Sequence, residues 1–309
     1  MRTLVITHKD CFDGHTAAWI YSRFVDRDAE FTACRYGDPA PDVKGRNVVI
    51  ADFSFPRGEM FRLACDAESL VVLDHHKTAQ EALLGLERQV LNETGKPITV
   101  VFDMERSGAG LTWDFYMGPP RTADPMKLSR PILIAQVEAR DLWRTNSFDG
   151  RYMANVYAAE MTFEAWDKLY DTSYEELLSR GEAILDYMHQ YGTKGLAEAF
   201  QRNVGRMGIA GRNSEGNFFL ERPAETYARD VWTVNMPYMN CSDYLSRLMA
   251  EKNVDFVMGY FCRNDGRWQF SLRSRNGFDC SVIAKAFGGG GHKEAAGFDV
   301  ASLTEVFLS

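Results

Sequence analysis

Three short apolar segments near the start of the chain, each ending in polar residues, limit most strongly the folds it can adopt. They are LVITH (4–8), NVVIADF (47–53) and LVVLDHH (70–76). Their apolar residues run almost without interruption, which is typical of parallel strands buried on both faces. Helical patterns at 15–25 and 57–67 separate them. The alternation predicts βαβ units that form one parallel sheet covered by helices on both faces.

The rest of the chain divides into a helical part and a second mixed part. Apolar residues at helical spacing continue through 108–117, 129–143 and 172–200. After about residue 203, strand-like segments and the turn NDG at 264–266 replace them. We therefore predict an α/β protein with two domains. The predicted parts are a doubly wound parallel-sheet domain at 1–172, a helical linker at 173–204 and a smaller α/β domain at 205–309.

Composition excludes several classes of protein. The six cysteines are dispersed without a C-x-x-C pair, which argues against a disulfide framework and a cysteine zinc site. The chain opens directly into a strand-like segment and has no run of about 20 apolar residues, so we expect a cytoplasmic protein that does not span a membrane. The formal net charge of −8 disfavours a grip on long duplex nucleic acid, which requires a positive surface.

Carboxylates and imidazoles follow each of the three predicted strands. The carboxyl ends of neighbouring parallel strands meet in one crevice, where ligands bind. The alternative is that these aspartates only cap a helix or open a turn, but the repetition at three strand ends favours a shared site. The candidates are His8, Asp10 and Asp13 after the first strand, Asp52 after the second, Asp74, His75 and His76 after the third, and Asp141 at the end of an apolar helix.

The chemistry of this set favours divalent cations. Several carboxylates at contact distance repel one another unless a cation neutralises them. Oxygen and imidazole ligands without thiolate suit Mn²⁺, with Mg²⁺ or Fe²⁺ as alternatives. Two such ions about 4 Å apart form the arrangement used for in-line phosphoryl displacement.

A second cluster lies near the end of the chain, in FGGGGHKEAAGF at 287–298. Consecutive glycines let backbone N–H groups approach one anion, and a following histidine can donate to a phosphate. The alternative is a flexible linker. Arg273 on the preceding strand can hold a phosphate in bidentate fashion. The predicted substrate-binding residues here are Arg273, Gly288, Gly289, Gly290, Gly291 and His292.

These motifs together resemble the DHH phosphoesterase superfamily, in the branch with a DHH-associated C-terminal domain. Asp74-His75-His76 matches the name-giving triplet, and GGGGHKEAAG matches the GGGH-x-x-AAG signature. The resemblance covers nearly the whole chain. Within the superfamily, the chain is similar to oligoribonuclease and phosphodiesterase members. It implies two α/β domains with the active site in the cleft between them, and two metal ions, usually Mn²⁺.

The resemblance also implies residue roles. It makes Asp74 and His76 catalytic, with Asp74 orienting the site and His76 facing the scissile phosphate. It further implies a substrate contact for Ser107 and Arg106, in a short third motif. In the first motif, Cys11 stands where the first aspartate of D-x-D-G falls, so Asp10, His8 or Cys11 remain alternatives for that metal position. The implied metal ligands are His8, Asp10, Asp13, Asp52, His75 and Asp141.

The leading functional hypothesis is a metal-dependent phosphodiesterase that cleaves short oligonucleotides or linear dinucleotides to mononucleotides. One alternative keeps the site and changes the substrate to a cyclic dinucleotide, 3′-phosphoadenosine 5′-phosphate or polyphosphate. Another is a non-catalytic nucleotide-binding regulatory module. The expected partner is a short nucleotide or phosphoester, and the oligomeric state stays open, with a homodimer as one alternative.

Overall fold

The computed structural model describes residues 2–118, 130–144, 146–206, 209–212, 218–222, 225–237 and 241–308. They divide into two compact units, Met1–Leu185 and Asp186–Ser309, and each unit is described by itself. The division falls inside the predicted linker 173–204, within the long helix α9 (Tyr174–Ala197).

A five-stranded parallel sheet forms the centre of the first unit. Its strands are β1 (Leu4–His8), β2 (Glu30–Cys34), β3 (Asn47–Ala51), β4 (Ser69–Asp74) and β5 (Thr99–Phe102). They lie in the order β2-β1-β3-β4-β5, and all neighbouring pairs are parallel. The order reverses at β1, so the crevice between the ends of β1 and β3 is the switch point where such sheets bind ligands.

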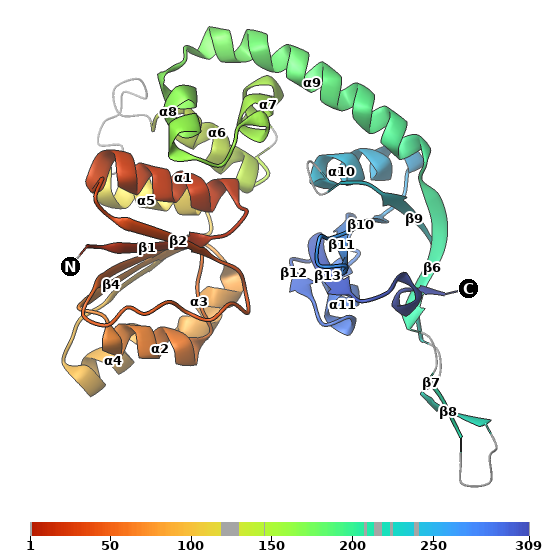
Figure 1. Cartoon of the computed structure of the whole chain (residues 1–309), viewed down its shortest axis with the longest axis horizontal. Helices are drawn as coiled ribbons and strands as arrows, with labels where there is room; N and C mark the ends of the chain where they lie inside the picture. The colour runs from red at the N-terminus through yellow and green to blue at the C-terminus, as the bar shows by residue number, and fades with distance from the viewer. Residues whose placement is uncertain are drawn as a thin grey trace. The chain divides into compact units, whose positions relative to one another are not determined.

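Helices cover both faces of this sheet (Figure 1). One face carries α1 (Phe12–Ile20), its π-helical continuation (Tyr21–Val25) and α5 (Gly108–Met117); the other carries α2 (Arg57–Asp66), α3 (Lys77–Leu83) and α4 (Leu86–Thr94). Strand residues alternate between the faces. Ile6 packs towards α2 and α4, whereas its neighbour Val5 packs towards the π-helical turn. Burial on both sides explains the continuous apolar runs of the sequence.

A further helical layer lies over α1 and α5. It contains α6 (Ile132–Asp141), α7 (Gly150–Ala158), α8 (Phe163–Asp171) and the first part of α9. The buried side chains of Trp19 and Trp166 fill its centre. Trp166 donates from Nε1 to Thr16 Oγ1 at 2.9 Å, which ties α8 to α1. This packing holds α6 against α1 and α5, and it thereby fixes the position of Asp141, the last residue of α6.

The second unit contains a seven-stranded mixed sheet in the order β12-β13-β11-β10-β9-β6-β14. Helices α10 (Cys241–Lys252) and α11 (Cys280–Ala286) pack against it, and β7 (Ile209–Arg212) pairs with β8 (Phe218–Arg222) in a separate hairpin. The sheet strands are β6 (Phe200–Arg206), β9 (Glu225–Asn235), β10 (Phe256–Cys262), β11 (Trp268–Ser274), β12 (Gly290–Gly291), β13 (Ala295–Val300) and β14 (Phe307–Leu308), with a 3₁₀ turn at Leu303–Glu305.

The α/β prediction is confirmed, and three predicted strands correspond to β1, β3 and β4. Two differences stand out. Strand β6 begins at Phe200 and belongs to the second sheet, so that sheet starts before the predicted domain start at 205. The edge strands β2 and β5 were not predicted, because β2 (EFTAC) leaves no continuous apolar run and β5 (TVVF) is only four residues long and partly buried throughout. None of the described helices is both long enough and apolar enough to cross a membrane.

Candidate metal centre

The predicted strand-tip residues of the first unit converge at the switch point of the sheet. His8 is the last residue of β1, Asp52 follows β3, and Asp74 ends β4. Three groups of possible ligands form there, and within each group the ligand atoms lie within 4.8 Å of one another. The groups are His8, Cys11 and Asp52; Asp52, His75 and His76; and Asp13, His75 and Asp141.

Asp13 is held by the N-terminus of α5. Its Oδ2 accepts from Gly108 N at 2.6 Å, and its Oδ1 accepts from Ala109 N at 3.1 Å. The helix begins so close to β3 that a Cβ on Gly108 would lie 2.4 Å from Asp52 Cβ, which only glycine avoids. Burial, followed by the charges of Asp52 and Asp141, raises the pKa of Asp13 well above its usual range. A cation beside Asp13 would relieve this cost.

Asp52 links two of the ligand groups. Its backbone has a φ of 56°, a left-handed conformation that aspartate tolerates better than most residues. Its Oδ2 accepts from Cys11 Sγ at 3.1 Å, and its Oδ1 lies 3.1 Å from His75 Nε2. The side chain is buried. Asp52 is therefore the residue that the His8–Cys11 group and the His75–His76 group share.

Both carboxylate oxygens of Asp74 accept hydrogen bonds, and one of them binds the two histidines that follow it directly in the sequence. Oδ1 accepts from His75 N at 2.7 Å and His76 N at 3.1 Å and lies 2.7 Å from His76 Nδ1, while Oδ2 accepts from Ser54 Oγ at 2.6 Å. Burial alone would raise the pKa of Asp74, but the hydrogen bonds from His76 and Ser54 outweigh it and lower that pKa. Asp74 thus orients the two histidines.

His75 lies between two carboxylates. Its Nε2 is 3.1 Å from Asp52 Oδ1 and 3.5 Å from Asp141 Oδ2. Burial alone would lower the pKa of His75, but the hydrogen bond to Asp52 and the charge of Asp141 outweigh it and raise that pKa to about 10. Burial and the charge of Asp52 raise the pKa of Asp141 to about 6. Without a cation, His75 therefore carries a proton between the two carboxylates. A divalent cation bound to His75 and these carboxylates would displace that proton.

The first motif differs from the expected pattern. Asp10 forms an ion pair with Arg35 at the half-exposed surface and belongs to none of the three ligand groups found among the described residues. Cys11 lies in a group with His8 and Asp52 instead. Burial, and next the charge of Asp52, raises the pKa of Cys11 well above its usual range, so the thiol is neutral beside Asp52. The sequence indicated Cys11 as a possible ligand because Cys11 aligns with the first aspartate of D-x-D-G.

Arg106 and Ser107 are both engaged in internal contacts. Arg106 pairs with Asp103 at 2.9 Å and with Asp114 at 3.0 Å. Ser107 is buried as the N-cap of α5, and its Oγ accepts from Gly110 N at 3.2 Å. These contacts hold the start of α5 in place. A contact of either side chain with a substrate stays a prediction.

The predicted substrate-binding residues of the second unit lie on β11 and at the end of α11. Gly288 and Gly291 have φ of 84° and 136°, conformations that favour glycine, and a Cβ on Gly289 would lie 2.1 Å from Gly297 O. His292 donates from its backbone N to Ala295 O at 2.7 Å, which closes the turn into β13. Gly288, Gly289 and Gly291 are thus required by the backbone path itself, whereas a Cβ on Gly290 would have no atom within 4 Å.

Arg273 has a partner in the second unit. Its Nε and Nη2 donate to Ser242 Oγ at 3.1 and 3.0 Å, and on the neighbouring strand β13 it lies opposite Ala295. A phosphate-binding role for Arg273, for Gly290 and for His292 stays a prediction.

Tyr36 is a candidate functional residue that the sequence analysis did not identify. It follows β2, and its ring centroid lies 5.4 Å from that of His8 and 5.1 Å from that of Phe53. Phe53 is buried, whereas Tyr36 is 58% exposed. One flank of the tyrosine ring is therefore supported beside the metal-ligand candidates. A single tyrosine in a loop leaves no periodic signal in a sequence.

Comparison with known proteins supports the interpretation of the glycine-rich motif. Residues 233–307 match the DHHA1 domain family. An uncharacterised protein of Acanthamoeba polyphaga mimivirus, R106, is 27% identical over 260 residues, which cover 82% of this chain. The aligned region covers 53% of the viral protein, so the chain spans about half the length of this curated relative.

Three solved structures resemble the chain at low identity. PggH of Vibrio cholerae, a pGpG-specific phosphodiesterase, has a TM-score of 0.47 at 12% identity, with 97% of this chain and 94% of that chain covered. An exopolyphosphatase-related protein of Bacteroides fragilis has a TM-score of 0.40 at 12% identity, with 97% and 87% covered. An uncharacterised protein of Helicobacter pylori G27 has a TM-score of 0.34 at 13% identity, with 99% and 94% covered.

A parallel-sheet unit presents an Asp-His-His triplet at a strand tip beside further carboxylates, and the same chain carries a DHHA1 domain. Residues 233–307 match the DHHA1 domain, and the Asp74-His75-His76 triplet of the first unit resembles that of the DHH phosphoesterase superfamily.

Proposed function

We propose that the protein is a metal-dependent phosphodiesterase that hydrolyses short oligonucleotides or linear dinucleotides to mononucleotides. The observation that carries this proposal is the convergence of Asp13, Asp52, His75 and Asp141 at the switch point of the sheet. Carboxylates and imidazole suit Mn²⁺, with Mg²⁺ or Fe²⁺ as alternatives. His8, Asp13, Asp52, His75 and Asp141 would hold two ions.

The residues around the ions have distinct tasks. When bound, the two cations neutralise charge on the phosphoryl oxygens and lower the pKa of a water molecule. Asp74 fixes the ring of His76 through Nδ1. The other edge of this ring faces the phosphate in our proposal, where it donates to the negative charge that develops during hydrolysis.

Replacement of His76 with alanine is expected to separate chemistry from metal binding. Because His76 is oriented by Asp74 and donates to the phosphate, kcat should fall by about 100- to 1,000-fold, as for the loss of one oxyanion donor. The dissociation constant for Mn²⁺, measured by titration calorimetry, should change by less than about 10-fold. A His76→Ala protein that no longer binds Mn²⁺ would instead make His76 a metal ligand.

Tyr36 favours a substrate that carries a base. An exposed aromatic ring beside a phosphate site offers a stacking surface that polyphosphate cannot use. The net charge of −8 also favours a small substrate over long nucleic acid. For these two reasons we favour a short nucleotide over polyphosphate as the substrate.

Replacement of Tyr36 with alanine is expected to raise KM for a dinucleotide by about 5- to 150-fold, the loss of one stacked base at about 1–3 kcal/mol. Tyr36→Phe keeps the ring and should behave like the wild type. The decisive comparison uses dinucleotides with each base removed in turn. For one of them, Tyr36→Ala should cause no further loss. An equal loss with both abasic substrates would remove Tyr36 from base recognition.

A substrate panel with Mn²⁺ tests the proposed function. It contains a 5′-phosphorylated dinucleotide, a 24-nucleotide single strand, a cyclic dinucleotide, 3′-phosphoadenosine 5′-phosphate and polyphosphate. We expect fastest release of mononucleotide from the dinucleotide. Preferred cleavage of another member would keep the phosphoesterase site and change the substrate. Failure to bind Mn²⁺ or cleave any member would favour the non-catalytic regulatory module.

A further inference from the structure

We propose that Glu138 is a positioning residue that joins the two helices carrying the Asp13 and Asp141 side of the metal centre. The inference rests on the proposed function, because it concerns the same metal site. Glu138 lies on α6, one turn before Asp141, and its side chain is buried. None of the three ligand groups found in the described residues includes it.

One carboxylate oxygen of Glu138 reaches the start of α5. Oε2 accepts from Ser107 N at 3.1 Å, and this bond is buried. The next two backbone N–H groups, those of Gly108 and Ala109, donate to Asp13. Three successive N–H groups of one helix terminus are therefore divided between Glu138 and Asp13. A shift of this terminus away from Glu138 would also move the donors of Asp13.

The fit between Glu138 and α5 is close. A Cβ on Gly110 would lie 1.7 Å from Glu138 Oε2, so a glycine at this position admits the carboxylate. Since Glu138 and Asp141 belong to the same helix, the contact sets the distance from α6 to α5. It thereby sets how closely Asp141 approaches Asp13, which shares a ligand group with it and with His75.

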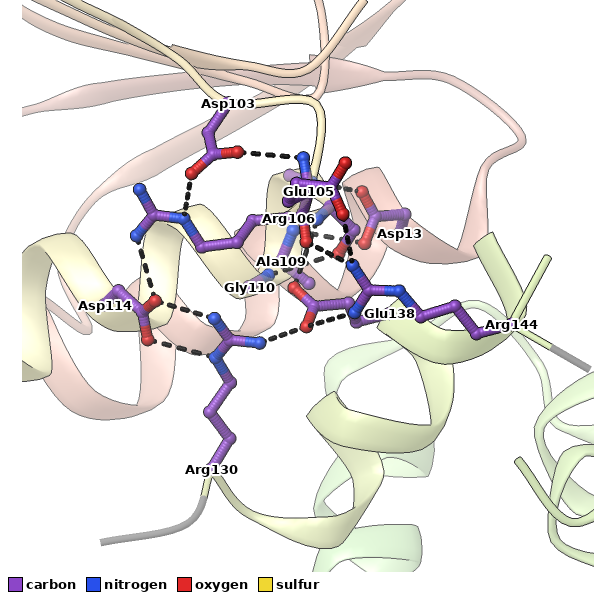
Figure 2. Close-up of polar contacts among 12 residues, drawn as sticks. Asp13, Asp103, Glu105, Arg106, Ala109, Gly110, Asp114, Arg130, Glu138 and Arg144 are labelled. Atoms are coloured by element: carbon purple, nitrogen blue, oxygen red, sulfur yellow. Dashed lines mark hydrogen bonds and ion pairs between the residues drawn. The ribbon is translucent and has the colours of Figure 1, made fainter. Parts of the chain in front are cut away.

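Arginines hold the carboxylate in this position (Figure 2). Arg130 binds Glu138 Oε1, and Arg144 Nη1 lies 3.8 Å from the same oxygen. Arg144 also donates to Glu105 O at 2.6 Å, in the loop that leads into α5. With Oε1 engaged by arginines, Oε2 is directed at Ser107 N, and the side chain has one orientation.

Asp114 provides a matched comparison within the same network. It is as buried as Glu138 and pairs with Arg130 at 2.6 Å and Arg106 at 3.0 Å. Asp114 lies further along α5, and the hydrogen bonds that its carboxylate accepts from described residues come from these arginines and not from Ser107. Loss of either carboxylate removes one of the two carboxylates that pair with Arg130 among the described residues. Only the loss of Glu138 also removes the acceptor at the start of α5.

The experiment compares Glu138→Ala, Glu138→Gln and Asp114→Ala in the full chain. It measures Tm without metal and the Mn²⁺ dissociation constant by calorimetry at a temperature well below every Tm. We expect Glu138→Ala and Asp114→Ala both to lower Tm, but only Glu138→Ala to weaken Mn²⁺ binding, by about 10- to 100-fold. Glu138→Gln keeps an oxygen acceptor for Ser107 N and should restore Mn²⁺ affinity to within about 3-fold of wild type.

The outcomes separate the inference from the proposed function. If Glu138→Ala bound Mn²⁺ as tightly as Asp114→Ala, Glu138 would stabilise the fold only, and the inference would be wrong while the metal site stood. If Glu138→Gln lost affinity as Glu138→Ala does, the hydrogen bond to Ser107 would not be the cause. A wild-type chain that did not bind Mn²⁺ would instead overturn the metal centre of the proposed function. Should Glu138→Ala fail to fold, Glu138→Leu replaces it in the comparison, because leucine fills the buried space.

Discussion

Replacement of Asp52 with asparagine should abolish Mn²⁺-dependent phosphodiester hydrolysis, with kcat/KM reduced by at least about 1,000-fold. Asp52 belongs to two of the three ligand groups, so its loss affects both predicted ions. Cation binding contributes several kcal/mol of transition-state stabilisation, and each 1.4 kcal/mol or so corresponds to a factor of ten. Asparagine also tolerates the left-handed φ of 56° at this position, so the backbone should be preserved.

The measurements are the rate of mononucleotide release and the number of Mn²⁺ ions bound. Asp66→Asn is the matched control, because Asp66 lies on the surface of the same unit in an ion pair with Arg62. Its activity should equal that of the wild type. Full activity of Asp52→Asn would refute the metal assignment. Asp10→Asn and Cys11→Ala in the same assay decide which residue occupies the first-motif position.

Replacement of Gly108 with alanine should damage the fold and the site together. The added Cβ would lie 2.4 Å from Asp52 Cβ and 2.8 Å from Asp52 Cα, and a backbone atom has little room to move. We expect a loss of about 3 kcal/mol in the free energy of unfolding, at the upper end for overpacking. The displaced helix terminus would also withdraw the N–H groups that bind Asp13, so Mn²⁺ affinity should fall.

Urea unfolding and Mn²⁺ titration measure the two effects. Gly58→Ala, on helix α2, is the control, because nothing lies within 4 Å of a Cβ at that position. It should leave Mn²⁺ binding unchanged and leave stability unchanged or raise it by up to about 1 kcal/mol. Equal stability of the Gly108→Ala and wild-type proteins would show that α5 can move away from β3 at little cost.

Part of this site could be predicted from the sequence for a clear physical reason. Strands β1, β3 and β4 are buried on both faces, so they leave continuous apolar runs, and the polar residues that end them are evident. The strand order could not be predicted from these runs, because the partly exposed β2 gives no such signal. The strand order reverses at β1 because β2 lies on the opposite side of β1 from β3.

Other features depend on contacts between distant segments. Asp10 pairs with Arg35 and belongs to none of the ligand groups found in the described residues, and nothing in the local pattern of the first motif indicates Arg35. In the sequence, nothing distinguishes Glu138 from an ordinary helical glutamate. Its contact with the start of α5 joins residues that are 31 positions apart. Arg106 precedes α5 and pairs with Asp114 inside that helix, a contact that depends on the formation of α5.

The wide separation of the predicted ligands along the chain ties cation binding to the folding of the whole first unit. From His8 to Asp141, these side chains meet only after five parallel strands and the α5 and α6 helices have assembled. An unfolded chain therefore lacks the site, and binding adds to the stability of the folded state, by about 2.7 kcal/mol when free Mn²⁺ is 100 times its dissociation constant. Under Mn²⁺ limitation, such a protein would become more susceptible to proteolysis as well as less active.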